Sequence, residues 1–274
     1  MNWKPYAFIL LVLVASGLIT RPVEDPAWSY LKEQEPALQL GALEEALGQG
    51  VTVALLGGFR AIFADFLWLR ASIHWEEDDL PGTYTMLHLV TTIDPRPLFF
   101  WRNGAGMIAF DMPVWRVRAA GGYDEVPSAV AQRIHAEQGH LGVNFLQRAI
   151  DFHPDEPILY VDIANIYYRR IEDVEMAAEY YRIAAERGAP AYAARIYAQL
   201  LREMGEDRAA YEWLVQLYPT LDDHDVTHQK PVVLQRIRDL EEALEIPLPQ
   251  RFRPETGAPF RQPAPPGFPD LGNP

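Results

Sequence analysis

The sequence contains no cysteine among its 274 residues. This absence excludes a disulfide framework, a thiol nucleophile, an iron–sulfur cluster and any zinc site built on cysteine. Basic residues are also scarce, with 24 lysines and arginines against 38 aspartates and glutamates, which gives a formal net charge of −14. A protein that neutralises nucleic-acid phosphates over a broad surface needs the opposite balance, so we expect no nucleic-acid partner.

Sequence motifs for catalysis or cofactor binding are equally scarce. Gly104-x-Gly106 does not follow an expected strand, so it lacks the context of a nucleotide-binding loop, and no G-x-S-x-G nucleophile motif occurs. His224 and His228 have the spacing of a metal-binding pair, but they lie in a polar turn rather than on a helix. We therefore expect no catalytic residues, no metal and no cofactor. The alternative is a hydrolase or metal-dependent enzyme whose site lies in residues 113–139.

One short apolar run, Tyr6–Thr20, carries no charge. Lys4 precedes it, and positive charge before an apolar segment keeps the N-terminus in the cytoplasm. Two interpretations remain open, an uncleaved signal-anchor over residues 1–21 or a cleavable signal peptide. The anchor is favoured because the run continues beyond Ala15-Ser16-Gly17, where a peptidase would cut. We expect a single-pass inner-membrane protein that contacts the bilayer through residues 3–21 and exposes its body in the periplasm.

A second apolar stretch, residues 51–71, contains two charged residues, Arg60 and Asp65. Each would cost about 3 kcal/mol in a bilayer, so we expect a core helix of the protein rather than a membrane span. Arg60 and Asp65 lie on different sides of such a helix, and each would need a partner on another helix, as in a buried structural ion pair. Small residues form a seam along one face, with Gly57 at its start and Trp68 at its end, which permits close helix packing.

The central part of the chain repeats itself with a period of about 34 residues. One set of positions has the spacing of the first helix of a tetratricopeptide repeat: Tyr160, Ile163, Ala164 and Tyr167, with Tyr197, Ala198 and Leu201 one period later. A second set fits the small–large–small pattern of its second helix: Ala177, Tyr181 and Ala184, then Ala210, Leu214 and Leu217. Residues 157–219 therefore resemble tetratricopeptide repeats, in which small residues let antiparallel helices approach closely.

A longer span, residues 55–245, resembles a group of bacterial, membrane-anchored tetratricopeptide-repeat proteins. The residues that carry this resemblance are Leu56–Arg60, Ala64–Arg70 and Lys230–Val233. The resemblance implies an α-solenoid with a scaffolding role and no known ligand. We expect an all-α fold, an α-solenoid of about four such helix pairs, with an N-terminal membrane helix and a C-terminal capping helix.

Two parts of the chain leave alternatives open. The insertion near residues 113–139 exceeds the repeat length and forms either a longer helix pair or a loop. The tail contains nine prolines in 28 residues, and it is either disordered or docked on a partner or on the chain's own helices. The expected parts are the membrane segment (1–21), a linker and helix (22–50), the repeat domain (51–219), the capping helix (220–246) and the tail (247–274).

A binding surface is expected on the first helix of each repeat, because these helices line the concave groove of a tetratricopeptide solenoid. The side chains expected to face this groove are Asn165, Tyr168, Arg169, Arg195 and Arg202. In some peptide-binding members of the family an asparagine and basic residues there hold a terminal carboxylate. We expect a non-enzymatic, membrane-tethered scaffold that binds other proteins. The alternative is an accessory subunit of a larger envelope complex, such as a secretion or pilus assembly.

Overall fold

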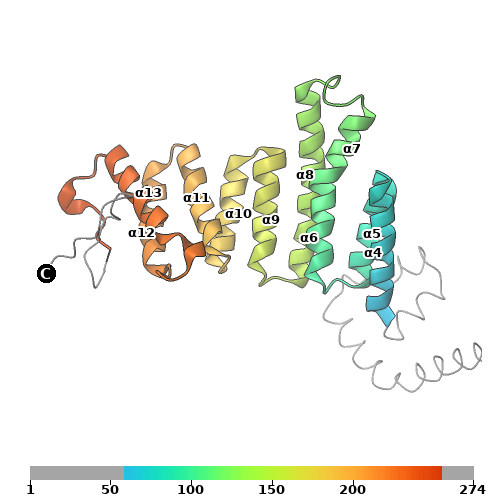
Figure 1. Ribbon diagram of the computed structural model, residues 1–274, viewed down its shortest axis with the longest axis horizontal. Helices are drawn as coiled ribbons and strands as arrows, with labels where there is room; N and C mark the ends of the chain where they lie inside the picture. Colours follow the sequence, from blue (N-terminus) through green and yellow to red (C-terminus); the bar gives the residue numbers. More distant parts are fainter. Residues whose placement is uncertain (1–58, 255–274) are drawn as a thin grey trace, which may run out of the picture. The chain divides into compact units, whose positions relative to one another are not determined.

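The computed structural model describes residues 59–254, which form helices joined by short turns and contain no β-strand (Figure 1). The all-α prediction is therefore confirmed for this part of the chain. The α-helices are α4 (Arg60–Glu76), α5 (Leu80–Ile93), α6 (Leu98–Gly106), α7 (Met112–Ala119), α8 (Ser128–Phe152), α9 (Pro157–Ile166), α10 (Val174–Glu186), α11 (Ala191–Glu203), α12 (Asp207–Leu217) and α13 (Lys230–Ala243). Two π-helical turns, η2 (Met107–Asp111) and η3 (Tyr167–Ile171), and three 3-10 turns, η4 (Tyr218–Thr220), η5 (Val226–His228) and η6 (Leu248–Gln250), complete the list.

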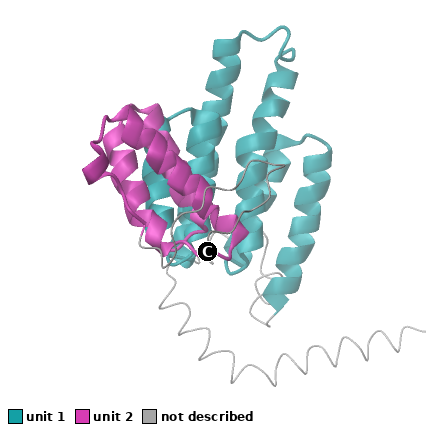
Figure 2. Ribbon diagram, turned by 60° about the vertical axis from the view of Figure 1, so that its left-hand side comes forward, with its two compact units in different colours: residues 1–187 teal, residues 188–274 magenta. Residues whose placement is uncertain are grey.

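The chain divides into two compact units, residues 1–187 and 188–274 (Figure 2). The boundary lies between α10 and α11. It therefore falls inside the repeat domain predicted for residues 51–219, and between the two repeat copies that agree best in sequence.

In the first unit, antiparallel helix pairs pack side by side (Figure 1). α4 pairs with α5 and α9 with α10, while α6, η2 and α7 form one continuous helical rod along α8. Local sequence determines where two of these helices begin. The Asp79 carboxylate accepts a hydrogen bond from Gly82 N at 3.1 Å, and the Asp173 carboxylate accepts one from Met176 N at 2.9 Å. Each aspartate therefore caps the helix that follows it.

The insertion at residues 113–139 is the longer helix pair, not the loop, of the two predicted alternatives. It consists of α7 and the first half of the 25-residue helix α8. Gly121 and Gly122 have φ of 118° and 87°, which side chains disfavour, and they reverse the chain between the two helices. In Figure 1 this end of the α7–α8 pair projects beyond the neighbouring helices.

Trp101 lies in the core of the first unit. Its ring is fully buried and packs against Phe145 with 5.0 Å between ring centroids. Its indole N–H donates to the Pro95 carbonyl oxygen at 2.7 Å, which satisfies the one polar group of the ring and fixes its orientation. The residues predicted to pack within the repeat are likewise buried: Tyr160, Ala164, Tyr167 and Tyr181.

Of the residues predicted to have structural roles between positions 57 and 68, some are packed or paired as expected and one is not. Arg60 has a partner on another element, since its Nε lies 3.8 Å from Asp94 Oδ1 at the end of α5. Trp68 is half-buried and packs edge-on against Phe99, with ring centroids 5.2 Å apart. The expectation of a buried ion pair is wrong for Asp65, which is exposed because no described helix covers its side of α4. Gly57 lies outside the described residues.

In the second unit, α11 and α12 form an antiparallel pair and α13 packs on α12. Gly205, with φ of 79°, turns the chain between α11 and α12. α13 lies within residues 220–246, the range predicted to contain the capping helix, and Pro231 stands in its first turn, where proline is favoured. The core of this unit is formed by Ala198, Leu201, Ala210, Leu214, Tyr218, Leu221, Val233, Leu234, Ile237 and Leu240.

The first residues of the proline-rich tail fold back onto this unit. The Phe252 ring packs edge-on against Tyr218 with centroids 5.4 Å apart, and its N–H donates to Glu241 Oε1 at 2.6 Å. Glu241 is fully buried and forms an ion pair with Arg238 at 2.7 Å, and Arg238 also donates to the Phe252 carbonyl oxygen at 2.8 Å. Up to residue 254, therefore, the tail docks on the chain's own helices.

No helix in the described part of the chain is long and apolar enough to cross a membrane. The predicted membrane segment, residues 3–21, lies outside the described residues, as do residues 255–274 of the tail.

Candidate functional site

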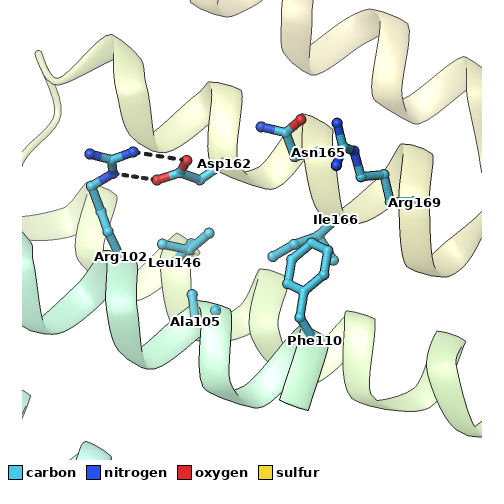
Figure 3. Close-up of a pocket in the computed structure, with 9 residues that line it drawn as sticks. Arg102, Ala105, Phe110, Leu146, Asp162, Asn165, Ile166 and Arg169 are labelled. Atoms are coloured by element: carbon cyan, nitrogen blue, oxygen red, sulfur yellow. Dashed lines mark hydrogen bonds and ion pairs between the residues drawn. The ribbon is translucent and has the colours of Figure 1, made fainter. Parts of the chain in front are cut away.

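A cavity of about 290 Å³ lies in the first unit, between the α6–η2 rod and α9–η3 (Figure 3). Its volume is at the small end of ligand sites, which begin at about 300 Å³. Apolar groups line its floor and polar side chains its rim. The floor is formed by Ala105, Gly106, Phe110, Leu146 and Ile166, and the rim by Arg102, Asp162, Asn165 and Arg169.

One side of the rim is closed by an ion pair between α6 and α9. Arg102 donates from Nε to Asp162 Oδ2 at 2.5 Å and from Nη2 to Asp162 Oδ1 at 3.2 Å, a bidentate arrangement that Figure 3 shows. Two parallel charge-assisted bonds hold both side chains in one geometry. This pair therefore fixes the spacing of the two helices at the cavity.

Asn165 lies between this ion pair and Arg169 on the same face of α9. Its Oδ1 accepts a hydrogen bond from the Tyr181 hydroxyl at 2.8 Å, so Tyr181 on α10 orients the amide group. In Figure 3 the amide nitrogen lies on the Asp162 side of the cavity, where its two N–H groups can donate. A carbonyl or carboxylate oxygen is the group that such a donor recognises.

Arg169 supplies an available positive charge on the other side of the rim. It is exposed, and its side chain makes no hydrogen bond or ion pair with any residue in 59–254. The neighbouring Arg170 is different. Burial lowers the pKa of Arg170, and the nearby positive charge of Arg169 lowers it further. The Arg170 guanidinium lies 4.5 Å above the centre of the Phe110 ring. The cavity therefore has a positively charged end.

Two π-helical turns flank the cavity, one on each wall. Phe110 belongs to η2 and Arg169 to η3, and Ile166 is the last residue of α9 before η3. A π-helical turn widens the helix locally and shifts the side chains that follow it, and such turns are frequent at functional sites. Both walls of the cavity therefore contain a backbone feature that a regular α-helix lacks.

The side chains predicted to face the groove are not all at this cavity. Asn165 and Arg169 line it, whereas Tyr168 is half-buried on η3 and does not. Arg195 is buried in the second unit, where its Nη1 donates to the carbonyl oxygens of Thr227 at 3.0 Å and His228 at 2.9 Å. Its guanidinium therefore stabilises the η5 turn and does not present a free charge to a partner.

Arg202 lines a separate cavity of about 470 Å³ within the second unit. Its Nε lies 3.4 Å from Asp207 Oδ1, so its charge is already engaged. The other lining residues are Ala198, Gln199, Glu203, Asp207, Leu214 and Arg236. Two arginines here face two carboxylates, and the cavity has no excess of either charge.

Sequence reasoning missed Arg102, Phe110 and Asp162. One signal was present, because Asp162, Asn165 and Arg169 are spaced i, i+3 and i+7 and so share one face of a helix. Arg102 is 60 residues from its partner Asp162, and no local pattern joins them. Phe110 points at the cavity from a π-helical turn, which local propensity does not predict.

Residues 59–254 contain no group of three or more His, Asp or Glu side chains that could hold a metal ion. Neither a model of a known protein family nor a curated protein sequence matches the chain. The cavity presents hydrogen-bond donors and a positive charge above an apolar floor, a combination that can bind an anionic or carbonyl oxygen next to an apolar group.

Proposed function

We propose that the chain is a membrane-tethered, extracytoplasmic scaffold of the tetratricopeptide-repeat type that binds a protein partner at the cavity between α6 and α9. The single observation that carries the proposal is the rim of this cavity. There, the amide of Asn165 and the guanidinium of Arg169, which has no partner within residues 59–254, stand above an apolar floor.

The partner segment is an extended peptide with an apolar side chain and an anionic group. The apolar side chain enters the floor beside Phe110 and Leu146, where its burial contributes the hydrophobic part of the affinity. The anionic group pairs with Arg169, while Asn165 donates to a carbonyl or carboxylate oxygen. Arg102 and Asp162 already neutralise each other, so they shape the site and add no net charge to it.

The alternative function is that of an accessory subunit of a larger envelope complex, such as a secretion or pilus assembly. The observation that favours it is the tail, because Phe252 is bonded to α13 and the proline-rich sequence continues after it to residue 274. In this case the tail, not the cavity, would make the principal contact with a neighbouring subunit.

Cross-linking of the full chain in native membranes separates these functions. We expect the double variant Asn165→Ala/Arg169→Ala to lower partner recovery at least tenfold, because it removes both the donor and the charge. Asn103→Ala is the matched control, since Asn103 is exposed on α6 and bonds only the carbonyl of its own helix at Phe99. If the double variant kept its partner, and truncation after Pro247 lost it, the cavity proposal would fail and the accessory-subunit function would stand.

A further inference from the structure

α4 carries an apolar stripe that no other described element covers. Its five side chains are each between 42% and 67% exposed: Phe59, Ile62, Phe66, Leu69 and Ile73. The opposite face of α4 is buried against α5, where Ala64 and Leu67 lie in one core cluster with Val90. Contiguous apolar side chains at this exposure mark an interaction surface.

The spacing of the stripe indicates what kind of partner fits it. Its residues follow one another at intervals of three, four, three and four. This alternation averages 3.5 residues, the period at which two helices pack lengthwise along each other. The best match is therefore another helix with an apolar stripe of the same spacing, which α4 of a second copy of the chain provides.

One charged side chain stands on each side of the stripe. Asp65 directly precedes Phe66 and Arg70 directly follows Leu69, positions that lie on opposite flanks of a stripe with this spacing. Both side chains are exposed, and neither makes a hydrogen bond or an ion pair with any residue in 59–254. These two opposite charges are therefore available to a partner.

We propose that the stripe is the contact surface of a homodimer, in which α4 of one copy lies parallel to α4 of the other. In a parallel pair the flank with Asp65 meets the flank of the second helix with Arg70, so two Asp65–Arg70 ion pairs form, related by the two-fold axis. In an antiparallel pair, flanks of the same charge would meet. The charges beside the stripe therefore select the parallel arrangement.

The stripe provides the affinity of this contact, and the charges provide its specificity. Two stripes in contact bury roughly 1,000 Å², the lower limit for a specific interface, so the dimer is a weak one. Exposed ion pairs add little affinity, but like charges in contact disfavour the wrong orientation. The net charge of −14 repels two copies at long range, although salt screens this repulsion beyond about 8 Å.

A membrane surface fits the stripe less well than a second copy does. Helices that lie on membranes expose many lysines and arginines beside the apolar face. The stripe of α4 has one arginine on one flank, Arg70, and an aspartate on the other, Asp65. This balance suits a surface that carries the same two charges in exchanged positions.

Disulfide trapping tests the contact directly, because an introduced thiol is the only one in the full chain. In a parallel pair each stripe residue faces its own equivalent, whereas in an antiparallel pair it faces a different residue. We expect Ile62→Cys and Leu69→Cys each to give a disulfide-linked dimer when intact cells that make the full chain are treated with a membrane-permeant oxidant. Ala61→Cys is the matched control, since Ala61 is exposed on α4 but lies off the stripe, and it should give at least tenfold less dimer.

Charge exchange tests the orientation independently. Asp65→Arg, added to Leu69→Cys, gives both flanks the same charge and should lower the yield of dimer at least tenfold. The double exchange Asp65→Arg/Arg70→Asp restores opposite charges and should return the yield to within twofold of that of Leu69→Cys alone. Both positions are exposed, so these substitutions leave the α4–α5 core intact.

Several outcomes would overturn the proposal. Without a dimer, fast maleimide labelling of Leu69→Cys would show a free face, and slow labelling would show that lipid, another protein or another part of the chain covers the stripe. A dimer that forms only between a chain with Phe66→Cys and a chain with Leu69→Cys would show an antiparallel pair. Equal yields from Ala61→Cys and Leu69→Cys, or a yield unchanged by Asp65→Arg, would show collision without a specific contact.

Discussion

At the residue scale, two glycines beside the cavity show how much a single Cβ matters. An added Cβ at Gly142 on α8 would lie 2.8 Å from Ala109 Cβ and 3.5 Å from the Ala105 carbonyl oxygen. An added Cβ at Gly106 would meet nothing within 4 Å. The first glycine is needed for the close approach of α8 to the α6–η2 rod, and the second is not needed for packing.

These contacts predict opposite effects of the same substitution. Gly142→Ala should lower the free energy of unfolding by about 1–3 kcal/mol, because relief of the clash costs more than the gain in helix propensity. Gly106 has a helical backbone, with φ of −58°, and open space around an added Cβ. Gly106→Ala should therefore raise the free energy of unfolding by about 0.5–1 kcal/mol. Urea denaturation measures both. A stabilising Gly142→Ala would contradict the packing described here.

His88 predicts a pH dependence of stability. Burial, with the positive charge of Arg148 adding to it, lowers the pKa of His88 from 6.5 to about 4. Arg148 Nη1 donates to His88 Nδ1 at 2.6 Å, which requires a neutral ring. The unfolded chain binds this proton near pH 6.5 and the folded chain only near pH 4, so the free energy of unfolding falls as pH falls through this window.

The size of this effect is on the order of 1–2 kcal/mol, since partial exposure of His88 reduces it below the value for a fully buried ring. His88→Asn keeps an acceptor for Arg148 but does not titrate. We expect the loss of stability between pH 7 and pH 4.5 to be smaller in His88→Asn than in the wild type. Burial also lowers the pKa of His135. Because His135 is present in both proteins, its contribution to the pH dependence cancels in the comparison. Equal losses would show that His88 is not the titrating group.

At the element scale, the capping helix depends on a buried charge. Glu241 on α13 is fully buried, and Arg238 and the Phe252 N–H are its partners. Arg238→Met should cost about 3 kcal/mol, because it leaves a carboxylate buried without a counter-charge. The double variant Arg238→Met/Glu241→Gln should recover more than 1 kcal/mol of that loss, as the amide oxygen can still accept from Phe252.

Arg208→Met is the matched control for this prediction. It removes an arginine from an exposed ion pair, with Glu212 at 2.9 Å one turn along α12. Exposed pairs of this kind contribute less than about 1 kcal/mol. Denaturation midpoints of the four proteins measure the difference. Similar losses for Arg208→Met and Arg238→Met would refute a special role for the buried pair.

The same elements show how far the sequence predicts the fold. The small and aromatic positions Ala164, Tyr167 and Tyr181 are buried as their spacing requires. Periodicity identifies helix faces but not neighbours. It therefore misplaced Asp65, and it could not foresee that Arg195 would turn inward to bond the η5 carbonyls.

The candidate site was predictable only in part for a related reason. Asn165 and Arg169 follow from the predicted repeat pattern, since the face opposite the packing residues Tyr160, Ala164 and Tyr167 can be read from the sequence. Arg102 and Phe110 reach the cavity through tertiary packing and a π-helical turn. Neither feature leaves a local sequence signal, because both depend on residues far apart in the chain.

At the scale of the whole molecule, we propose that a membrane anchor holds an acidic body outside the cytoplasm. The full chain should remain in the membrane fraction after an alkaline carbonate wash, because residues 3–21 contain the uncharged apolar run Tyr6–Thr20. An alkaline phosphatase domain fused after Pro274 should be active in the periplasm. Release of the chain by carbonate, or an inactive fusion, would contradict the predicted topology.

The central claim, that the cavity between α6 and α9 receives a side chain of a protein partner, is tested most directly by filling it. Gly106 lines the cavity, and a Cβ added there would meet nothing within 4 Å, so we expect the leucine side chain of Gly106→Leu to block the cavity, with Gly106→Ala as its control. The dissociation constant of the partner recovered by cross-linking is measured for both variants and the wild type. We predict a change in affinity within twofold for Gly106→Ala and a loss of at least tenfold for Gly106→Leu. Equal affinities of all three proteins would contradict it.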